Sequence, residues 1–101
     1  MAKIKWTFQA LEDIGSIANY IARDSFRYAI IFVINVFEAV ERLEIFPESG
    51  RIVPEINRKK IREINLGNYR IVYRIRQEVI EIVTVYHSAR LLDADQIDNS
   101  Q

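Results

Sequence analysis

The sequence has no cysteine, one histidine, three glycines and two prolines among its 101 residues. Without cysteine the chain forms no disulfide and offers no thiolate to a metal, and one histidine is too few for a zinc site. Three separate glycines cannot build a glycine-rich loop that cradles a phosphate group. We therefore predict no metal site and no cofactor.

Long apolar runs are also missing. The longest covers residues 29–34, far short of the roughly 20 residues that a membrane-spanning helix needs. The first residues lack the apolar core and the small-residue cleavage site of a signal peptide. The sequence therefore predicts a soluble, cytoplasmic protein with no membrane partner.

The chain does have the composition of a globular domain. Half of its residues are apolar and 28% are charged, a balance that favours a folded core over disorder. The length is close to the commonest size of one domain. We expect a single domain over residues 1–101, with an acidic tail over about residues 91–101 that is partly disordered.

The net charge of zero conceals an uneven distribution. Residues 51–76 carry eight basic and two acidic side chains, a net charge of +6, whereas residues 1–50 sum to −2 and residues 77–101 to −4. A basic patch can steer anionic partners even toward a neutral protein. The alternative is a merely solvated sheet face, and charge alone does not separate the two. We place the candidate functional site in this basic segment.

Two hydrophobic periods indicate the start of the fold. Residues 3–8 alternate strictly between polar and bulky apolar side chains, which predicts a half-buried strand. From about residue 11 to residue 21 the period becomes helical. Glu12 and Asp13 suit the positive end of that helix, so we expect them in its first turn.

A second helix is predicted over about residues 26–46, because Asp24 and Ser25 supply capping side chains and the apolar positions keep the helical period. Only about two residues join it to the first helix, so the two should form an antiparallel hairpin. Pro47 and the residues after it end the helix. Apolar residues spread almost all round this helix, which indicates either deep burial within one chain or a homodimer.

Three strands are predicted in the second half, over residues 60–64, 69–76 and 79–87, with short turns between them. Short turns make neighbouring strands antiparallel. The predicted fold class is therefore α+β: an N-terminal strand, an antiparallel helical hairpin and a three-stranded antiparallel meander.

Alternation assigns the side chains of the meander to two faces. In the central strand, the tyrosines and isoleucines at odd positions should pack on the helices. The even positions should project from an open face of the sheet: Arg70, Val72, Arg74 and Arg76. In the last strand, one face should hold three residues: Val83, Val85 and His87.

A pair of neighbouring strands should bring Lys60, Arg62 and Arg70 within reach of a single anion. Guanidinium groups suit phosphate or carboxylate, because they donate two parallel hydrogen bonds. Other interpretations stay open, since arginines on an outer sheet face are more often solubilising than functional. Arg62 beside Glu63 also fits a structural ion pair, and a lone histidine such as His87 is usually structural.

Several short motifs follow one another along almost the whole chain, and in this order they resemble the RelE/ParE superfamily of type II toxin–antitoxin toxins. The motifs are Trp6-Thr7, Leu11-Glu12-Asp13-Ile14, Phe46-Pro47, Gly50-Arg51, Val53-Pro54-Glu55, Ile61-Arg62-Glu63, Asn68-Tyr69-Arg70-Ile71-Val72-Tyr73-Arg74-Ile75 and Val85-Tyr86-His87-Ser88-Ala89-Arg90. The resemblance implies a toxin that inhibits growth and is held inactive by a cognate antitoxin protein, alone or in a toxin–antitoxin hetero-oligomer.

One branch of that superfamily, the RelE-like toxins, cuts mRNA on the ribosome. For this branch the resemblance implies Arg62, Arg70 and His87 as catalytic residues, with Glu55 matching the acid of some members only loosely. The chain departs from the RelE pattern after its last strand, where Ser88 stands near the position of an expected arginine and no aromatic residue follows.

The other branch, the ParE-like toxins, inhibits DNA gyrase and has no known nuclease activity. The motif at Val85 to Arg90 and the order of motifs in the basic segment favour this branch. The alternative is a RelE-like toxin that acts on the ribosome and mRNA, and a third interpretation is an inactive relic of a toxin. Five residues are the predicted binding set: Lys60, Arg62, Arg70, Arg74 and Arg90.

Overall fold

The computed structural model describes residues 1–90, 92 and 97. Its elements follow one another in the order β1 (Lys3–Trp6), α1 (Phe8–Ala22), α2 (Phe26–Glu41), the short 3-10 helix η1 (Arg42–Glu44), β2 (Arg51–Ile52), β3 (Ile61–Leu66), β4 (Tyr69–Arg76) and β5 (Val79–His87). The predicted α+β class, the helical hairpin and the meander are confirmed. The bounds predicted for the last two strands are those of β4 and β5.

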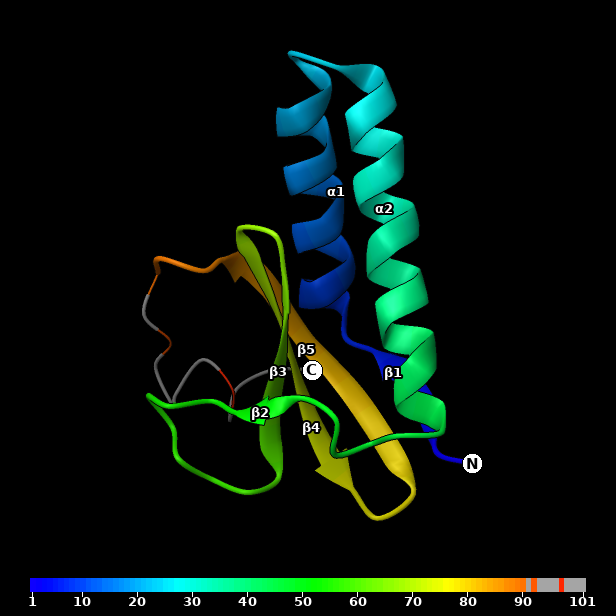
Figure 1. The fold of residues 1–101 in the computed structure, drawn as a ribbon, viewed down its shortest axis with the longest axis vertical. Coiled ribbons are helices and arrows are strands. Elements are labelled where there is room, and N and C mark those ends of the chain that lie inside the picture. The colour runs from blue at the N-terminus through cyan, green and yellow to red at the C-terminus, as the bar shows by residue number, and fades with distance from the viewer. Residues whose placement is uncertain (91, 93–96, 98–101) are drawn as a thin grey trace.

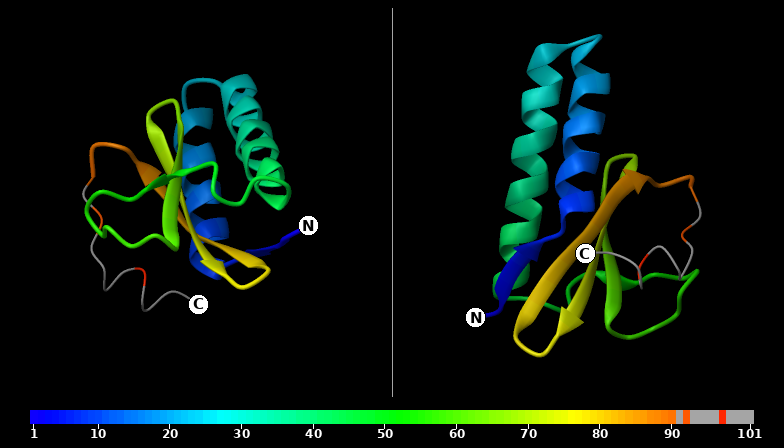
Figure 2. Two further views of the ribbon diagram at one scale, coloured as in Figure 1. Left: turned by 60° about the horizontal axis from the view of Figure 1, so that its bottom comes forward. Right: turned by 180° about the vertical axis from the view of Figure 1, so that it is seen from behind.

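The sheet has five strands in the order β1-β5-β4-β3-β2. The meander β3-β4-β5 forms its antiparallel centre, β2 adds a short antiparallel edge, and β1 lies parallel to β5 at the opposite edge. The two helices pack side by side against one face, and their outer turns extend beyond the sheet (Figure 1; Figure 2). The short strand β2 and the parallel pairing of β1 were not predicted.

The first helix begins earlier than predicted. The hydroxyl of Thr7 accepts a hydrogen bond from the backbone N–H of Ala10, so Thr7 caps the helix and Phe8 belongs to α1 rather than to the strand. Asp13 therefore lies beyond the first turn. Its carboxylate accepts hydrogen bonds from the hydroxyl of Thr84 and the backbone N–H of Val85, which tie α1 to β5.

The second helix is capped as predicted. The hydroxyl of Ser25 accepts a hydrogen bond from the backbone N–H of Tyr28. The helix ends at Glu41 and tightens into η1, so the α-helical part is shorter than the predicted span of 26–46. No helix among the described residues is long and apolar enough to cross a membrane.

The core lies in two layers, one on each side of the sheet. The odd positions of β4 pack on the helices as predicted, with Ile71 and Tyr73 fully buried. The opposite face is not open, which corrects the prediction. A second cluster of buried side chains covers it: Val53, Ile61, Val72, Val83, Tyr86, Leu92 and Ile97. Most of the predicted tail lies outside the described residues, but Leu92 and Ile97 are buried in this layer.

A β-bulge interrupts the alternation of β5. Val72 lies opposite Thr84, but Tyr73 lies opposite Ile82, so Val83 is an extra residue on β5. Val83 consequently packs in the second layer, whereas Val85 packs against the helices. The prediction that they share one face is therefore wrong. The hydroxyl of Thr7 donates to the carbonyl groups of Ile82 and Val83, which holds the bulge in place.

Candidate functional site

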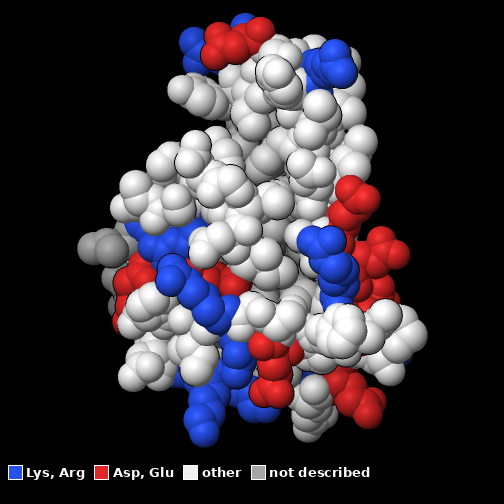
Figure 3. All heavy atoms as spheres, in the orientation of Figure 1, with Lys and Arg blue, Asp and Glu red and all other residues white. Residues whose placement is uncertain are grey.

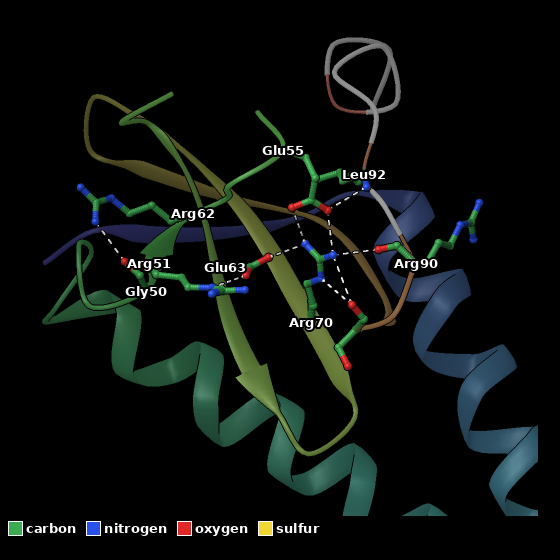
Figure 4. Close-up of polar contacts among 9 residues, drawn as sticks. Gly50, Arg51, Glu55, Arg62, Glu63, Arg70, Arg90 and Leu92 are labelled. Atoms are coloured by element: carbon green, nitrogen blue, oxygen red, sulfur yellow. Dashed lines mark hydrogen bonds and ion pairs between the residues drawn. The ribbon is translucent and has the colours of Figure 1, made fainter. Parts of the chain in front are cut away.

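Arg70 lies at the centre of a buried ion cluster on the second face of the sheet (Figure 4). Its Nη1 donates to Oε1 of Glu55 and Oε1 of Glu63, both at 3.0 Å, and its Nη2 donates to Oε2 of Glu55 at 2.7 Å. The Arg70 side chain is 6% exposed and that of Glu63 is fully buried. Buried charges of this kind are stable only when they are paired and hydrogen-bonded.

The pairing alters the acidity of both partners. The hydrogen bond from Arg70 lowers the pKa of Glu55 to about 2, and a hydrogen bond from the backbone N–H of Leu92 acts in the same direction. The carboxylate of Glu55 in turn raises the pKa of Arg70. Both groups are therefore fully charged at neutral pH, and neither is tuned to exchange a proton there.

The same cluster fastens the chain that follows β5. Arg70 donates to the carbonyl oxygen of Ser88, and its Nη2 donates to the carbonyl oxygen of Arg90 at 2.8 Å. The carboxylate of Glu55 receives the N–H of Leu92 at 3.0 Å. Because these bonds use all three nitrogens of the guanidinium group, Arg70 has little capacity left to hold a phosphate.

Arg62 lies on the other face of the sheet. It stands opposite Tyr73 in the register of β3 and β4, whereas Arg70 stands opposite Asn65. Its guanidinium Nη1 donates to the carbonyl oxygen of Gly50 at 3.0 Å and so supports the loop before β2. The prediction that Arg62 and Arg70 approach one anion is wrong, because their side chains project from opposite faces of the sheet.

His87 and Lys60 do not join Arg70 either. His87 lies at the exposed end of β5, on the helix side of the sheet, with its ring centre 5.7 Å from that of Tyr69. Its Nδ1 accepts a hydrogen bond from the N–H of Ala89. Lys60 is exposed just before β3. The three residues implied as catalytic are therefore distributed over both faces of the sheet.

The two remaining predicted residues lie on the face of Arg70. Arg74 is buried and its Nε donates to Glu81 at 3.0 Å. Arg90 is exposed and its guanidinium lies 5.8 Å from the ring centre of Tyr86. The guanidinium of Arg70 lies 5.5 Å from the same ring, so both cations contact one aromatic side chain.

Internal ion pairs neutralise much of the basic segment. Among the described residues, carboxylates of Glu48, Glu55, Glu63 and Glu81 pair with these arginines of the segment: Arg51, Arg62, Arg70, Arg74 and Arg76. The cations at residues 58–60 follow one another in an exposed turn. Figure 3 shows the resulting surface, where basic side chains gather over the sheet with acidic ones among them, while the outer hairpin is largely uncharged apart from its tip.

Sequence reasoning missed Glu55 and Glu63 as the partners of Arg70. Glu63 carried a signal, because it alternates with Arg62 and so had to face the opposite side of the sheet. Its pairing with Arg70 depends on strand register, which the sequence does not specify. Among the described residues, no group of histidine, cysteine, aspartate and glutamate side chains could hold a metal ion.

The sequence and the fold are matched by known proteins. The family model described as the ParE toxin of the type II toxin–antitoxin system parDE matches residues 4–92. The chain belongs to this family. A type II toxin of the ParE/RelE group has a cognate antitoxin as its partner, and the resemblance predicted from the sequence is confirmed.

Two relatives of this toxin cover most of its length. Toxin RelE2 of Caulobacter vibrioides is 31% identical over 91 residues, which are 90% of this chain and all of that protein. Y4kP of Sinorhizobium fredii, a candidate toxin by name, is 38% identical over 88 residues, 85% of this chain and 88% of that protein. A chain in the solved structure of the chromosomal ParDE toxin–antitoxin system from P. aeruginosa has the same fold, with a TM-score of 0.71 and 22% sequence identity. The match covers 86% of this chain and 96% of that chain.

Proposed function

We propose that this toxin acts by binding its target, without cleaving RNA, and that the target is DNA gyrase. The observation that carries the proposal is the state of Arg70. Its guanidinium is bonded to two carboxylates and two backbone carbonyl groups and is 6% exposed. A nuclease needs such a group free, so that it stabilises the charge that develops on the scissile phosphate.

The positions of the other implied catalytic residues support the same proposal. Acid–base cleavage requires its groups within hydrogen-bond reach of one reacting centre. Arg62 holds a loop on the helix side of the sheet, His87 lies at the end of β5, and Arg70 faces the second core layer. An endoribonuclease reaction would require these elements to rearrange.

The choice of gyrase follows from the branch of the family. The matching family model describes ParE toxins, and the ParE-like branch is the one that the sequence resembles more closely. Gyrase works on the chromosome, so the proposal places the toxin in the cytoplasm. One relative is named RelE2, so mRNA cleavage on the ribosome is the alternative function that the test must distinguish.

The antitoxin partner should complement two surfaces of the toxin. The hairpin exposes large apolar side chains over its outer turns, among them Phe26, Ile30 and Ile34, and these suit an apolar helix face. The exposed cations Lys59 and Lys60 suit acidic side chains, which would accelerate association at low salt.

Two assays run in parallel test the proposal. Purified toxin should inhibit supercoiling by gyrase, and it should leave mRNA intact in a translating extract. The cognate antitoxin should relieve the inhibition. Codon-specific mRNA cleavage without inhibition of supercoiling would instead establish the RelE-like activity.

A further inference from the structure

A pocket of about 350 Å³ lies where the C-terminal part of α2, the loop after η1 and β3 meet. Phe46 and Ile64 give it apolar walls, while Arg42, Arg51 and Asn65 bring hydrogen-bond donors. Nothing in the proposed action on gyrase uses this pocket.

The loop that forms one wall is held rigidly. The hydroxyl of Tyr73 donates to the carbonyl oxygen of Pro47 at 2.7 Å and accepts the N–H of Gly50 at 2.9 Å. Arg62 donates to the carbonyl oxygen of Gly50 from the same side of the sheet. A Cβ atom on Gly50 would lie 2.6 Å from the backbone oxygen of Glu63, so the loop sits directly against β3. The pocket wall is therefore formed before any ligand arrives.

Arg51 is oriented by the buried cluster. Its Nε contacts Oε2 of Glu63 at 2.5 Å, and Glu63 is held from its other oxygen by Arg70. The Arg51 side chain is 57% exposed, so its two terminal nitrogens remain available on the outer side. A guanidinium that is fixed through Nε presents its outer edge to an incoming carboxylate with little loss of entropy.

Arg42 gives the pocket its charge. Within the described part of the chain, Glu55 and Glu63 balance Arg51 and Arg70, two charges against two. Arg42 is exposed, and no ion pair neutralises it among those residues. The pocket thus carries a net positive charge beside an apolar wall.

We propose that this pocket binds an acidic peptide segment, with a carboxylate between Arg42 and Arg51 and an apolar side chain against Phe46 and Ile64. The volume is about ten times the roughly 30 Å³ that one water occupies in the liquid, so it accepts side chains rather than a single ion. A nucleic-acid phosphate would leave the apolar wall uncovered. The antitoxin of this family is the natural source of such a segment, and the inference rests on that partner, not on gyrase.

The test uses the full-length toxin and defined peptide probes, with NMR signals of the Arg42 and Arg51 side chains and the Gly50 amide as readout. The probe is N-acetyl-Leu-Glu-Leu-amide, its neutral control is N-acetyl-Leu-Gln-Leu-amide, and inorganic phosphate is the third ligand. The acidic peptide should shift these signals saturably and bind at least about fivefold more tightly than the other two.

Arg42→Gln should weaken binding of the acidic peptide about three- to tenfold without changing the melting temperature. Arg27→Gln is the matched control, because Arg27 is an exposed arginine in the first turn of α2, at the opposite end of that helix from the pocket. Equal shifts with the glutamine peptide would overturn the role of the carboxylate. Equal or tighter binding of phosphate would overturn the preference for a peptide, and unchanged binding by the Arg42 variant would overturn the site. Because gyrase is absent, none of these outcomes depends on the proposed target.

Discussion

Arg70 and Glu55 form a two-point ion pair across the second face of the sheet, with Nη1–Oε1 at 3.0 Å and Nη2–Oε2 at 2.7 Å. Glu55 lies in the loop after β2 and Arg70 in the middle of the sheet, so the pair closes that loop over the second core layer. The residue that family resemblance makes catalytic is here a structural centre. The structural role of Arg70 can therefore be measured first as an effect on the free energy of unfolding.

Arg70→Ala should destabilise the toxin by about 3–5 kcal/mol, because it leaves two carboxylates without their buried partner. Arg76→Ala is the matched control, since Arg76 pairs with Glu81 but its side chain is 63% exposed. That variant should lose less than about 1 kcal/mol. Urea denaturation measures both values, and equal losses would contradict a structural role for Arg70. A loss of toxicity in the Arg70 variant therefore says little about catalysis.

Glu55 should make the stability depend on pH in the acid range. Its pKa is about 2 in the folded protein against 4.5 for the free side chain, so its contribution is complete above about pH 4.5 and declines as the pH falls toward 2. Roughly 2–3 kcal/mol should be lost over this window. The free energy of unfolding of Glu55→Gln should change less with pH than that of the wild type. The control Glu48→Gln, at a side chain that is 71% exposed, should follow the wild-type curve; parallel curves for all three proteins would refute this role.

Two glycines should respond to alanine with opposite signs. In Gly50→Ala the new Cβ would lie within 3 Å of backbone and side-chain atoms of Glu63 and Tyr73, so the loop must shift and stability should fall by about 1–3 kcal/mol. In Gly15→Ala the Cβ meets no atom within 4 Å inside α1, and stability should rise by about 0.5–1 kcal/mol. Thermal denaturation compares the pair. A stable Gly50 variant would show that the loop is not tightly packed.

Two buried tyrosines should likewise differ when each loses its hydroxyl. The hydroxyl of Tyr73 bonds Pro47 and Gly50, so Tyr73→Phe should cost about 1–3 kcal/mol. The hydroxyl of Tyr86 is buried without a hydrogen-bond partner among the described residues, and burial raises its pKa to about 12. Tyr86→Phe should therefore be neutral or stabilising by up to about 1 kcal/mol. Equal losses in urea denaturation would indicate that Tyr86 has a bonding partner in solution.

Alternation predicted the two faces of β4 because nothing interrupts that strand between Tyr69 and Arg76. It failed on β5, where the bulge at Val83 reverses the faces of the following residues. The bulge in β5 is supported by contacts from Thr7 and Asp13, which lie more than 70 residues away in the sequence. The pattern of residues within β5 therefore does not predict it. The N-terminal cap of α2 at Ser25, by contrast, was predicted correctly, because capping depends on neighbouring residues alone.

Arg70 was selected from the sequence as a candidate binding or catalytic residue, and that role stays a prediction. Its environment depends on the register of β3 and on the covering of the sheet by the chain around Val53 and Leu92. Those contacts join segments far apart in the sequence. The net charge of +6 over residues 51–76 was likewise a property of the segment alone. Two acids from other parts of the chain, Glu48 and Glu81, pair with three of its arginines and cancel two of these charges.

Supercoiling by gyrase in the presence of wild-type toxin and of His87→Gln is the most direct test of the proposed mechanism. His87 is exposed, and its imidazole ring contacts Tyr69 and accepts the N–H of Ala89, so the variant should fold normally. A binding toxin with no catalytic residue predicts inhibition of supercoiling by both proteins at similar concentrations. No inhibition by either, together with mRNA cleavage in a translating extract that is lost in the His87 variant, would contradict it.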